Sequence, residues 1–172
     1  MNLQSNDFEL FGLPVRFSVD KAALDDRWKA LQREAHPDRH AASDAATQRR
    51  AMQWSVRINE AYQRLKNPLR RAGYLCELHG VPIGAEDNTA MPAAFLMQQM
   101  QWREDLEEAH GVADLERMAE EVAQARREML EGLRATADDK SDYQALAQQV
   151  RALMFVERFV RDVEQRLEQL GQ

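Results

Sequence analysis

The sequence predicts an all-α protein made of an antiparallel helix hairpin followed by a three-helix bundle. Apolar residues recur at spacings of three and four along most of the 172 residues, which is the period of one helix face. Short stretches rich in Pro, Gly and Asp interrupt this pattern, and no convincing strand pattern lies between them. We therefore expect a first domain at residues 1–76, a linker at 77–91 and a second domain at 92–172.

The first domain is predicted to consist mainly of two long helices. A short turn at residues 7–11 ends at Gly12 and Pro14, and Asp20 then suits the N-cap of the first long helix. Its apolar face consists of Leu24, Trp28, Leu31 and Ala35. The second long helix ends at Asn67-Pro68, and its face consists of Trp54, Ile58, Ala61, Tyr62 and Leu65. Two antiparallel helices joined by a loop bury such faces against each other.

The second domain is predicted to contain three helices. A short helical bridge at residues 69–79 leads to the boundary at 80–84, and Pro92 suits the first turn of a helix that ends near Gly111. A second helix runs from about Asp114 to Arg134, and residues 137–139 form the next turn. The last helix carries the apolar row Leu146, Val150, Leu153, Val160, Val163, Leu167 and Leu170. Short connections favour a small antiparallel bundle.

Composition excludes several classes of protein. No apolar run approaches the length of a membrane span, and the N-terminus lacks the basic start and apolar stretch of a signal peptide. The single cysteine, Cys76, rules out an internal disulfide framework and fits a reducing compartment, so we expect a cytoplasmic protein. A buried small hydrophobe is a simpler interpretation of Cys76 than a reactive thiol.

The two halves differ in charge. Residues 1–76 hold 13 Lys and Arg against 9 Asp and Glu, a net charge of +4, whereas residues 77–172 hold 10 against 20, a net charge of −10. A basic front and an acidic back indicate two units with different partners. The basic half is too mildly charged to favour nucleic acid, whose binders carry a concentrated basic stripe.

The tripeptide His36-Pro37-Asp38 lies between the two long helices of the first domain. Proline ends the first helix there, because it lacks an N–H and moves the preceding residue out of the α region. A polar pair on a loop between rigid helices indicates function. A metal site formed with His40 is disfavoured, since Pro37 breaks the helix that would align the two histidines. Phosphate loops, nucleophile elbows and Cys-X-X-Cys pairs are absent, so we expect neither metal nor cofactor.

The helix that begins at Pro92 carries more apolar residues than one buried face requires. The face predicted to pack inward consists of Phe95, Gln99, Trp102, Leu106 and Ala109. Leu96, Met97 and Met100 lie on a different face, and Glu104 and Glu108 continue that row. The surplus indicates an exposed patch, and methionine suits adaptable contact with a partner. Phe155, two residues beyond Leu153, is likewise predicted to point away from the core row of the last helix.

Plainer interpretations of these residues stay open. The surplus row and Phe155 are equally compatible with one wide face buried against two neighbours. Glu104 and Glu108 fit a solvated face, and so do the basic residues of the first long helix, Lys21, Arg27, Lys29 and Arg33.

The first domain resembles the J-domain family. The resemblance is carried by His36-Pro37-Asp38, which lies between two helices whose apolar stripes are in phase with each other. It is also carried by Asn59-Glu60-Ala61-Tyr62, Leu65 and Pro68 in the second helix. Further segments extend it over essentially the whole chain: Leu13-Pro14, Leu31-Gln32-Arg33, Arg71-Ala72-Gly73-Tyr74-Leu75, Leu78-His79-Gly80 and Phe95-Leu96-Met97. The chain is similar throughout to the HscB family of iron–sulfur cluster co-chaperones.

This resemblance implies an adaptor and not an enzyme. Proteins of this family bind the scaffold IscU and deliver it to an HscA-type chaperone, whose ATPase they stimulate. The residues that it assigns to chaperone binding are His36, Pro37, Asp38, Arg39, Arg27, Lys29 and Arg33. The residues that it assigns to scaffold binding are Leu96, Met97, Met100, Gln101, Glu104, Glu108 and Phe155. The absence of a targeting peptide and of the Cys-X-X-Cys pairs of eukaryotic relatives implies a bacterial-type cytoplasmic protein without zinc.

Three positions depart from the family pattern. Ala35 stands in place of the usual tyrosine before the tripeptide, Gln101 in place of a common glutamate, and Cys76 in place of a leucine. Three other interpretations stay open: a general J-protein that presents unfolded clients, a small hydrolase or metalloenzyme built on His36, Asp38 and His40, and a bundle that only oligomerises.

Overall fold

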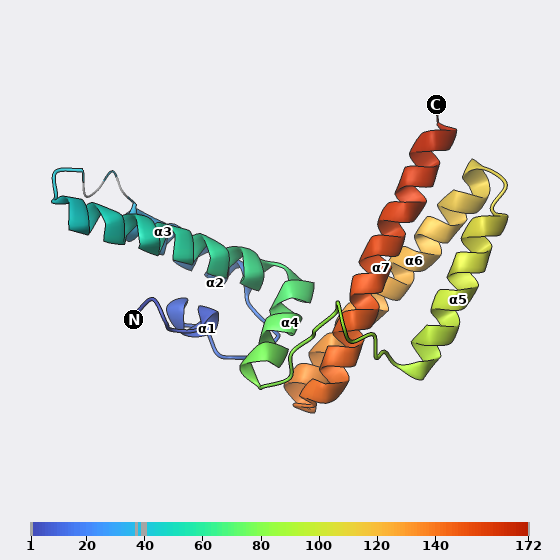
Figure 1. Ribbon diagram of the computed structural model, residues 1–172, viewed down its shortest axis with the longest axis horizontal. Helices are drawn as coiled ribbons and strands as arrows, with labels where there is room; N and C mark the ends of the chain where they lie inside the picture. The colour runs from blue at the N-terminus through green and yellow to red at the C-terminus, as the bar shows by residue number, and fades with distance from the viewer. Residues whose placement is uncertain (1, 37, 39–40, 172) are drawn as a thin grey trace. The chain divides into compact units, whose positions relative to one another are not determined.

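The computed structural model describes residues 2–36, 38 and 41–171. These residues form helices and no strand, which confirms the predicted all-α fold class. In chain order the elements are α1 (Asp7–Leu10), α2 (Lys21–Ala35), α3 (Ala45–Lys66), α4 (Pro68–Leu78), α5 (Ala93–Glu108), α6 (Val112–Arg134), the π-helical turn η2 (Ala135–Asp139) and α7 (Tyr143–Leu170) (Figure 1). The chain divides into two compact units, Met1–Leu75 and Cys76–Gln172, which are described in turn.

The core of the first unit lies between α2 and α3. Asp20 caps α2 as predicted, because its side chain accepts the backbone N–H groups of Ala22 and Ala23 at 3.0 and 3.2 Å. The predicted faces of the two helices supply the buried residues Leu24, Leu31, Ile58, Ala61, Tyr62 and Leu65. Trp28 stacks on Tyr62 with ring centroids 4.7 Å apart. The hairpin predicted from helical periodicity is therefore confirmed.

A buried carboxylate attaches α1 to the hairpin. Asp7 is fully buried, and its two oxygens lie 2.8 Å from Arg57 Nη1 and 2.5 Å from Arg64 Nε. Its backbone N–H donates to the Tyr74 hydroxyl on α4 at 2.9 Å. Buried charges in proteins are normally paired in this way. This network joins α1, α3 and α4 and holds the hairpin at the end opposite the loop between α2 and α3.

The second unit is built on α6 and α7. Both helices contribute buried apolar rows, and Trp102 of α5 stacks on Phe159 of α7 with centroids 5.6 Å apart. One predicted boundary was wrong: α5 ends at Glu108 and not at Gly111, which is the N-cap of α6. Helix α6 runs from Val112 to Arg134, close to the predicted span from about Asp114 to Arg134. The predicted turn at residues 137–139 belongs to the π-helical η2, in which Thr136 and Ala137 are buried.

The segment predicted as a linker, residues 77–91, is packed against α7. Arg151, which is only 6 % exposed, donates from Nε to the Ile83 carbonyl at 2.9 Å and from Nη1 to the Ala90 carbonyl at 3.1 Å. His79 stacks on Tyr143 with ring centroids 3.7 Å apart. Since these contacts lie within the second unit, the segment is part of that unit and not a separate connection.

Candidate functional site

The first candidate site is the turn between α2 and α3. Helix α2 ends at Ala35, and α3 begins after Asp44, whose side chain accepts the Thr47 backbone N–H at 2.7 Å. This hydrogen bond, with a weaker one from the Thr47 side chain, lowers the pKa of the Asp44 carboxyl below its ordinary value. The charged cap fixes where α3 begins and thereby anchors one end of the turn.

Within this turn, His36 and Asp38 present their side chains to solvent. Their exposed fractions are 56 % and 93 %. The backbone N–H of Asp38 donates to His36 Nδ1 at 3.2 Å, so a neutral imidazole carries its proton on Nε2. An Asp38 carboxylate oxygen lies 3.6 Å from the same nitrogen. His36 therefore shapes the turn, while the Asp38 carboxylate stays available to a partner. The predicted site residues Pro37 and Arg39 lie outside the described residues.

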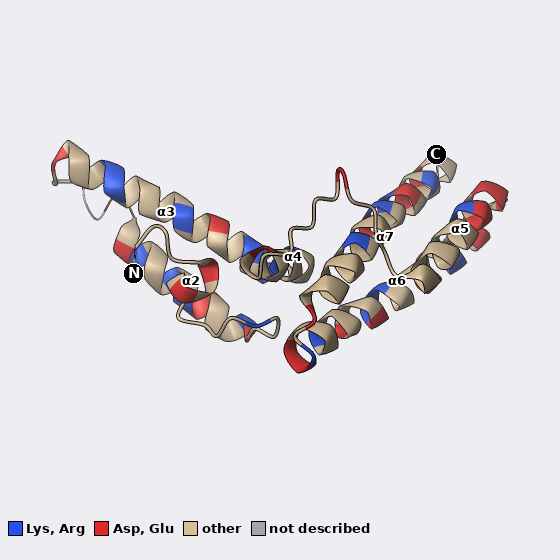
Figure 2. Ribbon diagram, turned by 60° about the horizontal axis from the view of Figure 1, so that its bottom comes forward, with Lys and Arg blue, Asp and Glu red and all other residues tan. Residues whose placement is uncertain are grey.

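The predicted basic residues on α2 do not form one patch. Arg27, Lys29 and Arg33 are all exposed. Lys29 and Arg33 lie one turn apart on the outer face, whereas Arg27 is two residues before Lys29 and so lies nearly on the opposite side of the helix. Asp26 and Glu34 on the same helix are also exposed, and Figure 2 shows both acidic and basic segments along α2. The helix thus offers a mixed surface on which only two of the predicted cations lie together.

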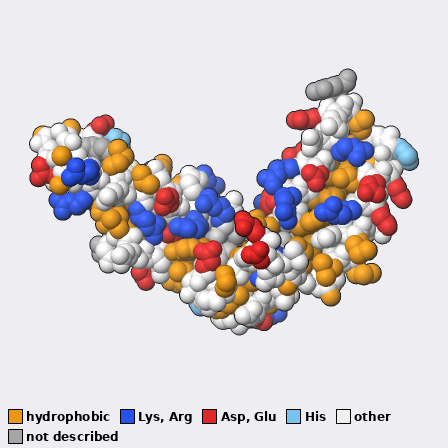
Figure 3. All heavy atoms as spheres, in the orientation of Figure 1, with side chains coloured by type: hydrophobic (Ala, Val, Ile, Leu, Met, Phe, Trp, Pro, Cys, Tyr) orange, Lys and Arg blue, Asp and Glu red, His pale blue; other side chains and the backbone are white. Residues whose placement is uncertain are grey.

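The second candidate site is the outer face of α5. Leu96, Met97 and Met100 are 42, 73 and 64 % exposed, and Figure 3 shows hydrophobic side chains at the surface over this helix. Glu104 and Glu108 are also exposed, which makes the C-terminal end of α5 acidic (Figure 2). The exposed row predicted from the surplus of apolar residues is therefore present. Gln101 is exposed as well, and its amide donates to Asp105 of the same helix at 2.9 Å.

The prediction for Phe155 was wrong. Its side chain is 6 % exposed, and its ring packs edge-on against Phe95 at 5.8 Å and stacks on Phe159 at 6.1 Å. Arg103 lies over the ring with its guanidinium carbon 5.1 Å from the centroid. Helix α5 lies across this flank of α7 and covers a position that would otherwise face solvent. The wide buried face considered above is thus correct for Phe155 and not for Leu96, Met97 and Met100.

Sequence reasoning missed Arg103, which lies beside the exposed row. An arginine three residues after Met100 is typical of a solvated helix face, and only its contact with a ring of another helix singles it out. No group of three or more His, Cys, Asp or Glu that could hold a metal occurs among the described residues. No helix in that part of the chain is long and apolar enough to cross a membrane.

Comparison with known proteins gives consistent matches over both units. Residues 91–164 match the family model described as the HscB C-terminal oligomerisation domain. A co-chaperone protein HscB homolog of Bordetella petrii is 50 % identical over 157 residues, which are 91 % of this chain and 92 % of that protein.

Two solved structures have the same arrangement of helices. Chaperone HscB from Vibrio cholerae superposes with a TM-score of 0.79 at 36 % identity, covering 96 % of this chain and 99 % of that one. The human co-chaperone protein HscB has a TM-score of 0.86 at 25 % identity, covering 96 % of this chain and 84 % of that one. The first unit is therefore a J-domain, and the second is the helical bundle of these proteins. The chain belongs to the HscB family of co-chaperones.

Proposed function

We propose that this chain brings two proteins together in iron–sulfur cluster assembly. Its second unit binds an IscU-type scaffold, and its His36-Pro37-Asp38 loop stimulates the ATPase of an HscA-type chaperone that receives the scaffold. The observation that carries this proposal is the Asp38 side chain, which is 93 % exposed between two packed helices. Helix packing alone does not explain why a carboxylate is placed there. We place the protein in a bacterial cytoplasm, where Cys76 stays reduced.

The loop acts through charge and position. Asp38 forms a charge-assisted hydrogen bond with an arginine of the ATPase, while His36 holds the turn in shape. Lys29 and Arg33, together with Arg27 and Arg39, speed encounter with an acidic surface. Stimulation requires that the loop bind the hydrolysing conformation of the ATPase more tightly than the resting one, because only differential affinity shifts a conformational equilibrium.

The scaffold binds the outer face of α5. Leu96, Met97 and Met100 supply apolar contact, and Glu104 and Glu108 attract basic groups at the edge of that contact. Gln101 contributes no charge, and Phe155 supports α5 from the inside without touching the partner. Because one chain holds both proteins, the effective concentration of scaffold at the chaperone rises without any direct contact between them.

The loop assignment is tested by Asp38→Asn, which removes the carboxylate charge and keeps the side-chain shape. We expect it to abolish stimulation of a purified HscA-type ATPase and to leave scaffold binding unchanged. Asp26→Asn is the matched control, because Asp26 is an exposed carboxylate on α2 away from the turn. Normal stimulation by the Asp38 variant would show that the loop is not the stimulating element.

The scaffold assignment is tested by Met97→Ala combined with Met100→Ala. Both side chains are mostly exposed, so the double variant should fold normally and bind an IscU-type scaffold at least tenfold more weakly. The control is Val112→Ala, which shortens an exposed apolar residue on α6 of the same unit. Equal affinities for the double variant and the control would show that the outer face of α5 is not part of the proposed interface.

A second candidate for this face is self-association. The family model that matches residues 91–164 is described as an oligomerisation domain, and the apolar row on α5 lies within it. A second copy binding there would compete with the scaffold. Sedimentation of the wild type and of the Met97/Met100 double variant separates the two functions, since only self-association predicts a loss of dimer in the double variant.

A further inference from the structure

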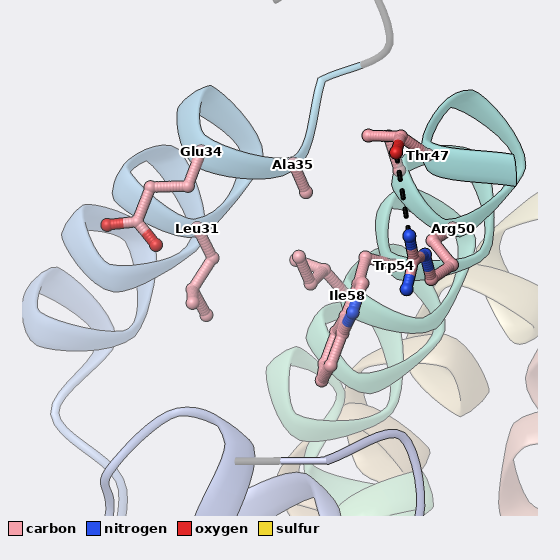
Figure 4. Close-up of a pocket in the computed structure, with 8 residues that line it drawn as sticks. Leu31, Glu34, Ala35, Thr47, Arg50, Trp54 and Ile58 are labelled. Carbon is pink, nitrogen blue, oxygen red and sulfur yellow. Dashed lines mark hydrogen bonds between the residues drawn. The ribbon is translucent and has the colours of Figure 1, made fainter. Parts of the chain in front are cut away.

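The first unit contains an apolar groove beside the candidate loop that the proposed contacts do not use. The groove is open to solvent, has a volume of about 430 Å³, and lies between the end of α2 and the first half of α3 (Figure 4). This volume is in the range of small-ligand and side-chain pockets. Its apolar walls are Leu31, Ala35, Ala51, Trp54 and Ile58. We refer to it as the α2–α3 groove.

Small residues on both helices create the groove. Ala35 from the last turn of α2 and Ala51 from α3 contribute only methyl groups where the two helices would otherwise fill the space between them. Leu31 and Ile58 close the inner end and are buried, whereas Trp54 is only partly buried. A partly exposed tryptophan in an apolar recess is unfavourable in isolation and typical of the residues that anchor protein interfaces.

The rim of the groove carries charge of both signs. Glu34 lines it from α2, and Arg50 lines it from α3. Arg50 Nη2 lies 3.5 Å from the Thr47 hydroxyl oxygen, which places its guanidinium on the α3 side of the opening (Figure 4). Arg49, the neighbouring residue, is exposed and does not line the groove. An entering segment therefore meets the cation of Arg50 on the α3 side, whereas the Glu34 carboxylate is directed outward from α2 (Figure 4).

The position of the groove connects it with the loop. Ala35 directly precedes His36, and Asp38 lies three residues further along the chain. Only two residues separate Ala35, which lines the groove, from Asp38, so a protein surface that contacts the Asp38 carboxylate lies within a few residues' reach of the groove. The groove thus continues the interface proposed for the loop and is not an unrelated feature of the hairpin.

We propose that the α2–α3 groove receives one large apolar side chain of the same ATPase partner that contacts Asp38, with an acidic residue of that partner placed against Arg50. This inference rests on the proposed function of the loop. The loop and the groove then have different roles. Asp38 triggers the ATPase, and the groove supplies affinity by burying Trp54 and the entering side chain.

The first test fills the groove with Ala35→Leu and measures stimulation of a purified HscA-type ATPase over a range of co-chaperone concentrations. The concentration for half-maximal stimulation should rise about tenfold or more, because a large apolar side chain can no longer be buried. The maximal stimulated rate should stay unchanged, since Asp38 is intact. Ala22→Leu, at an exposed position near the start of α2, is the control and should leave both values unchanged.

The second test does not depend on how well the filled variant folds. Arg50→Glu and Arg49→Glu make the same change of charge at neighbouring exposed positions of α3, and only Arg50 lines the groove. The Arg50 variant should raise the half-maximal concentration clearly more than the Arg49 variant. Equal effects would mean that only the general charge of α3 matters and would overturn the proposal.

The outcomes separate this proposal from the function on which it rests. If Asp38→Asn abolishes stimulation while Ala35→Leu and Arg50→Glu behave like their controls, the groove proposal is wrong and the loop function stands. If Asp38→Asn still stimulates normally, the loop function itself fails. If Ala35→Leu changes only the oligomeric state of the chain in sedimentation, the groove binds a second copy and the proposal is overturned.

Discussion

The guanidinium of Arg103 lies 5.1 Å from the ring centroid of Phe155, and together with Phe95 it closes the ring off from solvent. The same helix that presents an apolar row outward therefore has an inner side that buries an aromatic residue of α7. This relationship separates residues that hold α5 in place from residues that α5 offers to a partner.

The first prediction contrasts these two roles. Phe155→Ala should lower the free energy of unfolding by about 3 kcal/mol or more, because it removes a buried aromatic ring and leaves a cavity. Met97→Ala should change it by less than about 0.5 kcal/mol, since that side chain is largely in solvent. Urea denaturation followed by circular dichroism measures both. Equal effects of the two variants would contradict the division of α5 into an inner and an outer side.

The second prediction concerns the buried carboxylate of the first unit. Asp7→Asn should lower the free energy of unfolding by about 3 kcal/mol, because it leaves Arg57 and Arg64 in a partly buried site without their anion. Glu60→Gln, which neutralises an exposed carboxylate on α3, is the control and should have little effect. A cost for Asp7→Asn no greater than that of the control would show that the network does not hold α1 in place.

The third prediction concerns the segment held by Arg151. Arg151→Met keeps most of the apolar stem and removes the donors to the Ile83 and Ala90 carbonyls, which should cost about 1–3 kcal/mol. Hydrogen exchange should quicken at the Asn88 amide, which is bonded to the Gly84 carbonyl in the same segment. Arg158→Met, at an exposed position of α7, is the control. Unchanged exchange at Asn88 would mean that residues 77–91 are ordered without Arg151.

Helical periodicity was sufficient to predict the hairpin, its loop and the exposed row on α5. Each depends on the spacing of apolar residues within one helix, as with Leu24 and Leu31 or with Leu96 and Met100, and that spacing is visible in the sequence. It was insufficient for Phe155, whose burial depends on where α5 crosses α7. A pattern within α7 contains no information on that crossing.

The α2–α3 groove is a second feature that the spacing of residues within one helix does not predict. Ala35 and Ala51 are ordinary helix residues, and each alone predicts nothing. They form a recess only because the two helices bring them to the same level. Likewise, a π-helical turn such as η2 has the composition of an ordinary loop, so residues 137–139 were predicted as a turn. A feature formed by two elements can be predicted only when the positions of both elements are known.

The last prediction is a pH dependence. Burial raises the pKa of the Cys76 thiol from 9.0 to about 11. Between these values the unfolded chain releases a proton that the folded chain retains, so the free energy of unfolding falls as the pH rises. The shift corresponds to a loss of about 3 kcal/mol across that interval, at about 1.4 kcal/mol for each pKa unit. Well below pH 9 the thiol makes no pH-dependent contribution, because it is protonated in both states.

Other groups also titrate in this interval, so the measurement is a difference. Urea denaturation of the wild type and of Cys76→Ala at pH 8, 9, 10 and 11 separates the thiol from the tyrosines and lysines that both chains share. Cys76→Ala should be the less stable protein at pH 8, because it leaves a small cavity at a fully buried position, and the gap should narrow as the pH rises. Parallel curves for the two proteins would show that the Cys76 thiol ionises equally in the folded and unfolded chains, contrary to its burial against α7.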